Sequence, residues 1–537
     1  NTLIGGLSGD ALTTAGNNVA IGYQAHSTDD LGSRNVAVGT EALSDMNFAT
    51  ATDSFNVAVG DQAGKRITTG INNTLMGGGA GDALTDADNN VAVGFAALSS
   101  DTLGSLSIAI GKDALFAQNF TTATNAYNVV VGASAGVSVT TGSDVTVLGG
   151  QALGAETKGS KSTAIGRAAL AAQNFTTSAN AFNTALGHAA GTAVTTGVQN
   201  TLLGNDAGKS LQDADNNLAI GHQALDADTL GSRSVAIGSF ALTTQNFTTA
   251  TNAYNTIVGY AAGSNITTGS INTLMGGLTG DALTTGNSNV AVGYNALSTD
   301  TLGDNTVAIG KSALVSQNFT TSTDSHNTAV GFHAGLNVST GVENTFIGAN
   351  AGDTCSSGTG NTVLGFNADV GGGGANGRIA IGISTVCVSD QRVTIGFGGN
   401  TASLELDGSD TSWAASSDER LKENITDSTA GLSFINDLRP VTYNWKKAKD
   451  VPDDLPQYIE GSNDPCLGYE YGTELHGFVA QEVKTAIDNH SEVKEGQSIW
   501  VTDETTVQAL APAALIPMLV KAIQELSAEV EKLKSGG

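Results

Sequence analysis

The sequence has few of the residues that build compact cores and disulfide frameworks. Its 537 residues include only 6 prolines and 5% aromatic residues, which argues against both a proline-rich disordered polymer and an aromatic core along most of the chain. The cysteines, Cys355, Cys387 and Cys466, lack the spacing of a disulfide framework or a zinc site. No apolar run is long enough to cross a membrane. We therefore expect no bound metal, no cofactor and no membrane insertion.

Positive charge is also scarce. The chain has 23 lysines and arginines against 51 aspartates and glutamates, which gives a formal net charge of −28 at pH 7. The phosphate backbone of nucleic acids repels such a chain. We therefore exclude nucleic acid as a partner and interpret the acidic balance as a source of solubility.

Glycine, in contrast, is abundant, and it ends a pentapeptide that recurs from Gly5 to Gly396. The motif reads NTLIG at 1–5 and NVAVG at 35–39, and its glycine occurs 23 times. The steps between these glycines run 17, 17, 21 and 17 residues and then restart, so that four coils make a 72-residue super-repeat. The super-repeats differ from one another by whole coils, and the pattern on either side is unchanged. This is typical of a solenoid whose units contact only their neighbours.

The motif predicts a short strand in each coil. In NVAVG at 35–39, Val36 and Val38 point one way and Ala37 the other. The glycine ends the strand where the backbone turns or approaches another backbone closely. We expect the asparagine to stack from coil to coil and to satisfy turn amides. Segments of the 21-residue steps, such as QNFTTATNAY at 118–127, are interpreted as loops that bulge from one face.

A small residue often follows the motif glycine after three positions, as at Ala25, Ala42, Ala63 and Ala97. We interpret this fixed phase as a packing constraint from a neighbouring chain. Each coil also holds too little apolar material to bury a core alone, so we expect self-association into a homotrimer. The predicted fold class is mainly β, with a trimeric stacked-coil shaft of the β-roll or β-helix type over residues 1–400.

The Asn/Ser-x-Ala-x-Gly-x-x-Ala pattern of the coils resembles the head repeats of trimeric autotransporter adhesins and the collar-like repeats of phage tail fibres. This resemblance implies a trimeric fibre. A bacterial trimeric adhesin is therefore one alternative function. Such an adhesin would end in amphipathic membrane strands, whereas this sequence ends in KLKSGG at 532–537, so we rank it lower.

A polysaccharide-cleaving tailspike is a second alternative, because such enzymes are stacked-strand trimers that cleave glycosides with paired carboxylates. Acidic pairs such as Asp86 and Asp88, or Asp213 and Asp215, recur at equivalent positions of the repeat. A catalytic pair would occur once rather than in successive copies. We interpret these residues as solvated turns and predict no external substrate.

After the repeat, a Ser/Asp-rich connector at 401–416 leads to a region of ordinary composition. It contains three separate blocks, which read SDERLKENI at 417–425, LRPVTYNWK at 438–446 and HGFVAQEV at 476–483. In this order they resemble the endosialidase-type C-terminal intramolecular chaperone domain, a self-cleaving serine peptidase found at the ends of phage tail fibres and tailspikes. The resemblance implies that residues 417–537 form a small α+β chaperone domain.

The resemblance also implies that Ser417 is the nucleophile, that Lys422 is its base, and that the bond between Ser416 and Ser417 is cut. A lysine can activate a serine hydroxyl when burial lowers the pKa of its amine. Residues five positions apart lie about 140° out of phase on a helix, so a regular helix would not join these side chains. From the two residues alone, the alternative is a helix N-cap by Ser417 or Asp418 with Lys422 in solvent.

The other two blocks are interpreted as structural. Tyr443 and Trp445 alternate along a strand and should lie in the core. His476 is interpreted as a packed histidine rather than a catalyst. Gln481 and Glu482 begin a predicted helix, and the sequence does not assign them a role.

A coiled-coil helix is predicted at about 513–534. The positions of its a/d seam fall seven apart, and they are Ile516, Ile523 and Val530 at a and Leu519, Leu526 and Leu533 at d. β-Branched residues at a with leucine at d favour two strands in isolated parallel coils. We still expect a trimer, because the long shaft overrides so short a seam.

These patterns together predict a phage tail-fibre or tailspike shaft for host attachment, located in the virion tail and made in the host cytoplasm. Its last domain assembles three chains and then cuts itself off before Ser417, and this autoproteolysis is the only enzymatic activity predicted. The predicted partners are two further copies of the chain, other tail proteins of the virion, and a host cell-surface receptor such as a glycan or an outer-membrane component.

Overall fold

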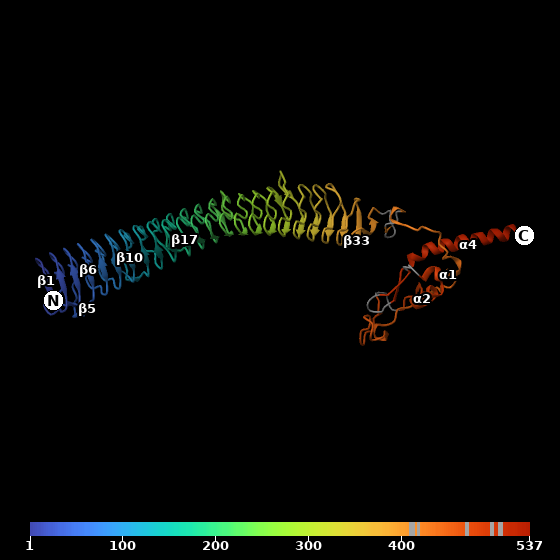
Figure 1. Ribbon diagram of the computed structural model, residues 1–537. Helices are drawn as coiled ribbons and strands as arrows, with labels where there is room; N and C mark the ends of the chain where they lie inside the picture. The colour runs from blue at the N-terminus through green and yellow to red at the C-terminus, as the bar shows by residue number, and fades with distance from the viewer. Residues whose placement is uncertain (408–413, 416–418, 468–471, 495–498, 503–507, 537) are drawn as a thin grey trace. The chain divides into compact units, whose positions relative to one another are not determined.

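The structure is a computed structural model of the chain. It describes residues 1–407, 414–415, 419–467, 472–494, 499–502 and 508–536. The chain divides into two compact units, Asn1–Ser416 and Ser417–Gly537. Figure 1 shows the stacked coils of the first unit and the helices of the second.

The first unit is a β-solenoid whose motif strands stack into one parallel sheet (Figure 1). Each strand pairs in register with that of the next coil, so that Leu3 lies opposite Ala20, and Ala20 opposite Ala37. The 23 strands are, in stacking order, β1 (Thr2–Ile4), β2 (Val19–Ile21), β4 (Val36–Val38), β6 (Val57–Val59), β7 (Thr74–Met76), β8 (Val91–Val93), β10 (Ile108–Ile110), β12 (Val129–Val131), β13 (Thr146–Leu148), β15 (Thr163–Ile165), β17 (Thr184–Leu186), β18 (Thr201–Leu203), β19 (Leu218–Ile220), β21 (Val235–Ile237), β23 (Thr256–Val258), β24 (Thr273–Met275), β25 (Val290–Val292), β27 (Val307–Ile309), β29 (Thr328–Val330), β30 (Thr345–Ile347), β31 (Thr362–Leu364), β32 (Ile379–Ile381) and β33 (Arg392–Phe397). The predicted mainly β fold of stacked coils is therefore confirmed.

The sheet ends by changing direction. Strand β34 (Asn400–Glu405) runs antiparallel to β33, and β35 (Ala414–Ala415) runs antiparallel to β34. These two strands add no further coil, so the parallel stack stops at β33.

The motif glycines lie one above another along one edge of the sheet, as predicted. Gly5 has a φ of +129°, and a Cβ built on it would stand 2.6 Å from the carbonyl oxygen of Gly22. Gly22 approaches Gly39 in the same way, and such contacts continue along the array to Gly396. Any side chain here would collide with the backbone of the next coil, and positive φ disfavours one as well.

The hydrophobic core runs inside the coils, and from β2 to β32 the middle residue of each motif strand is buried in it. Ala20, Ala37 and Ala58 are fully buried, whereas the flanking Val36 and Val38 are half-buried. The buried residues of successive coils form one continuous cluster. The inner position is most often alanine, but Leu75, Ile257 and Phe346 occupy it in other coils and are also fully buried.

Two expectations about this core are wrong. Ala25, Ala42, Ala63 and Ala97 are fully buried within their own chain rather than by packing against a neighbouring one. The coils also bury a continuous core without a partner chain, because the apolar side chains of each layer are covered by the layers above and below it. Thin apolar content is therefore no argument for self-association.

The motif asparagines form the predicted ladder inside the stack. Asn18 Oδ1 accepts the N–H of Asn35 at 2.8 Å, and Asn18 Nδ2 donates to the carbonyl of Gly32 at 2.9 Å. Asn35 Oδ1 in turn accepts the N–H of Asn56 at 3.0 Å. Each side chain thus satisfies buried backbone groups of the following coil.

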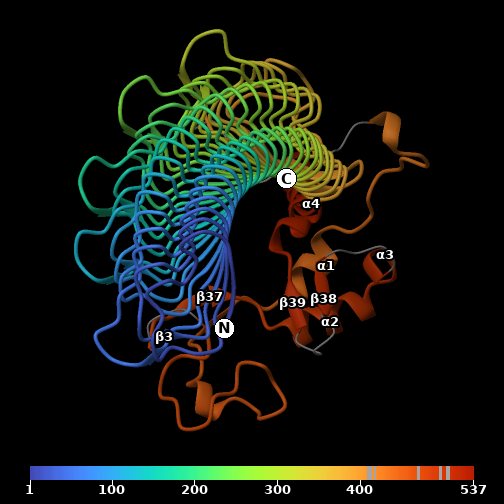
Figure 2. The ribbon, with the colours of Figure 1, turned by 90° about the vertical axis from the view of Figure 1, so that its left-hand side faces the viewer.

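The 21-residue coils carry loops, which protrude along one side of the array in Figure 2. Each loop is accompanied by a second pair of short parallel strands, namely β3 (Gly32–Ser33) with β5 (Thr52–Asp53), β9 (Gly104–Ser105) with β11 (Thr124–Asn125), β14 (Gly159–Ser160) with β16 (Ala179–Asn180), β20 (Gly231–Ser232) with β22 (Thr251–Asn252), and β26 (Gly303–Asp304) with β28 (Thr323–Asp324). Only part of the predicted segment bulges outward. Residues 121–123 are exposed, whereas Gln118 and Phe120 are buried.

The second unit is a small α+β fold. Its elements are η1 (Glu419–Leu421), α1 (Leu432–Asn436), β36 (Val441–Tyr443), η2 (Ala448–Asp450), β37 (Leu475–Gly477), α2 (Ala480–Asn489), α3 (Ser491–Lys494), β38 (Trp500–Thr502), β39 (Gln508–Leu510), η3 (Pro512–Leu515) and α4 (Ile516–Ser535). Phe434 of α1 packs with Val483 and Ile487 of α2 at the centre of its core. The predicted C-terminal helix is thus confirmed as η3 and α4. No helix in the described residues is both long and apolar enough to cross a membrane.

Candidate functional site

The predicted cut lies where the two units meet. The first unit ends at Ser416 and the second begins at Ser417, but both serines lie outside the described residues. Lys422 is described, exposed to solvent, and follows the short helix η1, where its N–H donates to the carbonyl of Glu419 at 3.0 Å. The pairing of Ser417 with Lys422 therefore stays a prediction.

The segment that follows the predicted cut is bound to the C-terminal helix. Glu525 of α4 accepts the N–H of Leu432, the first residue of α1, at 2.7 Å. A Cβ built on Gly431 would stand 2.7 Å from the carboxylate carbon of Glu525, so the absence of a side chain there makes room for the contact. Ala430 is buried in the core of the unit. The chain after Lys422 is thus tied to the helix that carries the a/d seam.

The second and third sequence blocks are neighbours in space. Strands β36 and β37 pair antiparallel, with Thr442 opposite His476. Beside them, the guanidinium of Arg439 binds the carboxylate of Glu482 through two hydrogen bonds of 2.9 and 2.5 Å. These bonds lower the pKa of the Glu482 carboxyl. Glu482, to which the sequence assigned no role, therefore joins the two blocks, whereas Gln481 is exposed.

Two expectations for these blocks change. Tyr443 and Trp445 are half-buried rather than core residues, and their rings pack edge to face with centroids 5.3 Å apart. Strand β36 ends at Tyr443, before Trp445, and the side of the antiparallel pair that carries Thr442 and His476 is open to solvent. The interpretation of His476 as a packed histidine is wrong, because its side chain is exposed on β37.

A buried histidine elsewhere in the unit was missed. His490, at the end of α2, binds Glu492 through Nδ1 and Asp437 through Nε2, each at 2.8 Å, and its ring packs edge to face on Phe434. These two carboxylates raise the pKa of the His490 imidazole. Only the imidazolium has two N–H donors, so the geometry favours the charged form. The sequence offered no signal, because Asp437 is remote in the chain.

The a/d positions of α4 are exposed in the part of the chain that the structure describes. The exposed fractions range from 40% for Val530 to 78% for Leu533, and the seam comprises Ile516, Leu519, Ile523, Leu526, Val530 and Leu533. The N-terminal part of the helix borders an apolar pocket lined by residues that include Leu438, Phe478 and Leu519. This surface can bury apolar area by association with other helices.

The recurring acidic pairs of the shaft belong to turns. Asp86 accepts the hydroxyl of Thr69 at 2.6 Å, and Asp88 accepts the N–H of Ile71 at 2.7 Å. Asp213 and Asp215 make the equivalent contacts. Each carboxylate therefore holds the turn of the preceding coil. No group of three or more potential metal ligands lies together in the part of the chain that the structure describes.

Comparison with protein families finds one match. Residues 417–492 match the model of a peptidase family described as "Chaperone of endosialidase". The match begins at Ser417 and includes all three sequence blocks. Neither the curated proteins nor the solved structures contain a match to the chain. A long β-solenoid is thus followed by a region similar to an intramolecular chaperone with peptidase activity.

Proposed function

We propose that this protein is the shaft of a phage tail fibre or tailspike, assembled as a homotrimer by a C-terminal chaperone that then cuts itself off. The coincidence at Ser417 carries this proposal. The family match begins at the same residue as the second compact unit. A peptide bond between two independently packed units can be broken without opening either core.

The cleavage proceeds from the residues on either side of that bond. Lys422 is exposed in the single chain, and once assembly has buried it, its uncharged amine takes the hydroxyl proton of Ser417. The Ser417 oxygen then attacks the carbonyl carbon of Ser416. The amide bond breaks as the Ser417 nitrogen takes up a proton, which leaves an ester between the two residues. Water hydrolyses this ester and releases the carboxylate of Ser416 and the hydroxyl of Ser417.

Two apolar surfaces support assembly with other copies of the chain. The third position of many motif strands is apolar and exposed, with exposed fractions from 36% for Ile110 to 58% for Ile4. These residues are Ile4, Met76, Ile110, Leu148, Leu186, Leu203, Met275, Ile309, Ile347 and Leu364. An apolar row repeated once per coil is best matched by a second sheet with the same repeat. The exposed seam of α4 favours parallel chains in register.

The order of events follows from folding kinetics. Contacts between long chains form only after large loops have closed, which makes unassisted assembly slow. A C-terminal trimer of α4 holds the chains together and lowers this barrier. Once the chaperone has been removed, the fibre cannot retrace the same path, so the cut confers kinetic stability.

The assembled shaft would act in the virion tail after synthesis in the host cytoplasm. Its partners would be other tail proteins and a host cell-surface receptor, such as a glycan or an outer-membrane component. The bacterial adhesin and the polysaccharide-cleaving tailspike remain alternatives, and no described feature of the shaft favours them. Release of reducing sugars from host capsule by the purified protein would favour the tailspike enzyme.

The cleavage is tested by expressing the full chain and weighing its products by mass spectrometry. Wild type should yield a fragment that begins at Ser417. Ser417→Ala and Lys422→Ala should remain full-length, and so should Lys422→Arg, because a guanidinium cannot serve as a base. Ser416→Ala is the matched control and should be cut normally. Processing of Ser417→Ala at the same bond would refute the mechanism.

A further inference from the structure

In four of the 21-residue coils, a glutamine binds a buried carboxylate of the preceding coil. In the second super-repeat, Gln118 Nε2 donates to Asp101 Oδ2 at 2.6 Å and to Ser107 Oγ at 3.0 Å, and Asn128 Nδ2 donates to Gln118 Oε1 at 2.8 Å. These four residues are fully buried. The equivalent pairs are Glu156 with Gln173, Asp228 with Gln245, and Asp300 with Gln317. The glutamine thus donates to one oxygen of each buried carboxylate, and the other oxygen accepts backbone N–H groups.

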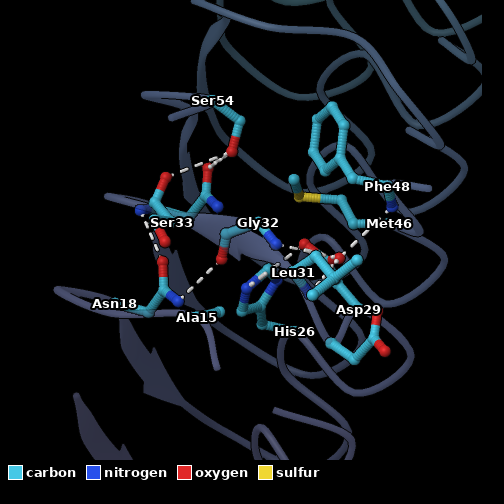
Figure 3. Close-up of polar contacts among 12 residues, drawn as sticks. Ala15, Asn18, His26, Asp29, Leu31, Gly32, Ser33, Met46, Phe48 and Ser54 are labelled. Carbon is cyan, nitrogen blue, oxygen red and sulfur yellow. Dashed lines mark hydrogen bonds and ion pairs between the residues drawn. The ribbon is translucent and has the colours of Figure 1, made fainter. Parts of the chain in front are cut away.

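The first super-repeat departs from this arrangement. Asp29 stands at the position of Asp101, but Met46 occupies the position of the glutamine and Asn35 that of the serine. His26 occupies a position at which the other four super-repeats have leucine. Figure 3 shows His26, Asp29 and Met46 gathered at this site. A thioether donates no hydrogen bond, so Met46 cannot replace the lost amide.

These replacements leave polar atoms unpartnered inside the coil. Neither ring nitrogen of His26, nor Oδ2 of Asp29, nor Nδ2 of Asn35 has a hydrogen-bond partner among the described residues. His26 and Asp29 are fully buried, with 3.8 Å between Nε2 and Oδ2. Buried polar groups without partners destabilise the closed structure relative to one that admits water.

The surroundings of His26 oppose its protonation. Burial lowers the pKa of its imidazole, and the nearby Asp29 carboxylate offsets this only in part. The other polar groups that act on the ring are the backbone carbonyls of Gly32, on the same coil, and of Leu43, on the following coil. The preceding coil contributes the N–H of Gly9, which binds the backbone carbonyl of Ala25. Asp29 is thus the charged group that faces His26 within the described residues.

We propose that the coils between Gly22 and Gly60 form an acid-sensitive joint, at which the array opens first as the pH falls. An opened coil exposes His26 to water, where it binds a proton with a pKa of about 6.5. The closed coil binds that proton less readily, so acidification favours opening. The four super-repeats that carry the glutamine have leucine at the position of His26, and they lack this response between pH 7.5 and 5.5.

Hydrogen exchange of the full-length protein, read by mass spectrometry, tests this proposal. After correction for intrinsic exchange rates, the protection of residues 22–60 should fall about tenfold between pH 7.5 and 5.5, as expected for one linked proton. Peptides from residues 94–132, which carry the complete cluster, are the internal control. Their protection should not change over the same range.

Variants distinguish acid-induced opening at residues 22–60 from a general destabilisation of the protein by acid. The triple variant His26→Leu, Asn35→Ser and Met46→Gln introduces only residues that equivalent coils already contain, so it should fold. It should abolish the acid-induced loss of protection, whereas Asn35→Ser alone should retain it. Constant or rising protection of residues 22–60 in wild type at pH 5.5 would overturn the proposal, since the closed pair would then take up the proton itself. An equal loss of protection in the triple variant would overturn it as well.

Discussion

Gln245→Met would remove the donor of a buried carboxylate while nearly conserving side-chain volume. Gln245 Nε2 donates to Asp228 Oδ2 at 2.6 Å and to Ser234 Oγ at 3.1 Å, and its Oε1 accepts Asn255 Nδ2 at 2.7 Å. Asn255 keeps a second bond, to the carbonyl of Gly269 at 2.8 Å. The variant therefore deprives mainly Asp228 of a partner, and it recreates the arrangement that Met46 gives to the first super-repeat.

The magnitude follows from the atoms left unsatisfied. A buried acceptor without a donor costs about 1–3 kcal/mol, and more when it is charged. Together with the weakened contacts of Ser234 and Asn255, we expect the free energy of local opening to fall by about 3 kcal/mol. Each ~1.4 kcal/mol is a factor of ten, so hydrogen exchange near Asp228 should accelerate by about two orders of magnitude at neutral pH.

The loss should depend on pH in a defined direction. Burial raises the pKa of the Asp228 carboxyl, and the hydrogen bond from Gln245 counteracts this rise. The variant should therefore raise the pKa further. A carboxyl whose pKa is higher in the closed than in the open state stabilises the closed state as the pH falls through the closed-state pKa. The difference between variant and wild type should thus shrink between pH 7 and pH 4.

The assay is hydrogen exchange of peptides from residues 221–259 in both proteins. The intact pair of Asp300 and Gln317 serves as the internal reference. Asn246→Ala is the matched control, because it removes an amide from an exposed neighbouring position. Wild-type protection in Gln245→Met at pH 7, or a deficit that is equal at pH 4, would contradict this account of the cluster.

Three further changes test other parts of the structure. Gly204→Ala should destabilise the shaft by roughly 2–4 kcal/mol, because the added Cβ would collide with the Gly221 carbonyl and because Gly204 has a φ of +144°. Gly16→Ala is the control: its Cβ would enter open space, so the variant should melt like wild type. Leu526→Asp should prevent both assembly and cutting, so trimers in light scattering or normal processing would argue against the coupling. His490→Gln should lower the melting temperature of the C-terminal unit below about pH 6.5 but not at high pH. The pKa of His490 is raised in the folded unit, so its contribution to stability is lost as the pH rises through that pKa. An equal fall in melting temperature at pH 9 would rule out this role of His490.

The sequence predicted where each coil of the shaft begins and ends, because one residue type marks that position. A motif glycine stands at every step from Gly5 to Gly396, and the close approach of neighbouring backbones requires it there. The buried face could not be read in the same way. In a strand of only a few residues, Val36, Ala37 and Val38 are apolar on both faces, so alternation alone does not say which face is inside. The mistaken inference of a thin core followed from this ambiguity.

The buried polar clusters were missed for a different reason. Gln118 begins the segment QNFTTATNAY, which is rich in polar residues and gives a coil its four extra residues, so the local pattern indicated a loop. It is buried because Asp101 of the preceding coil needs a donor, and a contact between coils leaves no trace in the local pattern. Likewise, the resemblance to the chaperone family identified the blocks that contain Arg439 and Glu482, but their ion pair joins segments that are remote in sequence.

The separate cores of the two units explain why a cut at Ser417 would serve this protein. The shaft residues form one buried cluster and the C-terminal residues another, with no residue in common. Each coil is held by the coils next to it, so the stability of the shaft is a sum of contacts between neighbouring coils. The C-terminal unit, in contrast, exposes its a/d seam, which the proposed association with further copies of the chain would bury. A unit that is needed to bring chains together, but not to hold the finished shaft, is one that can be removed once assembly is complete.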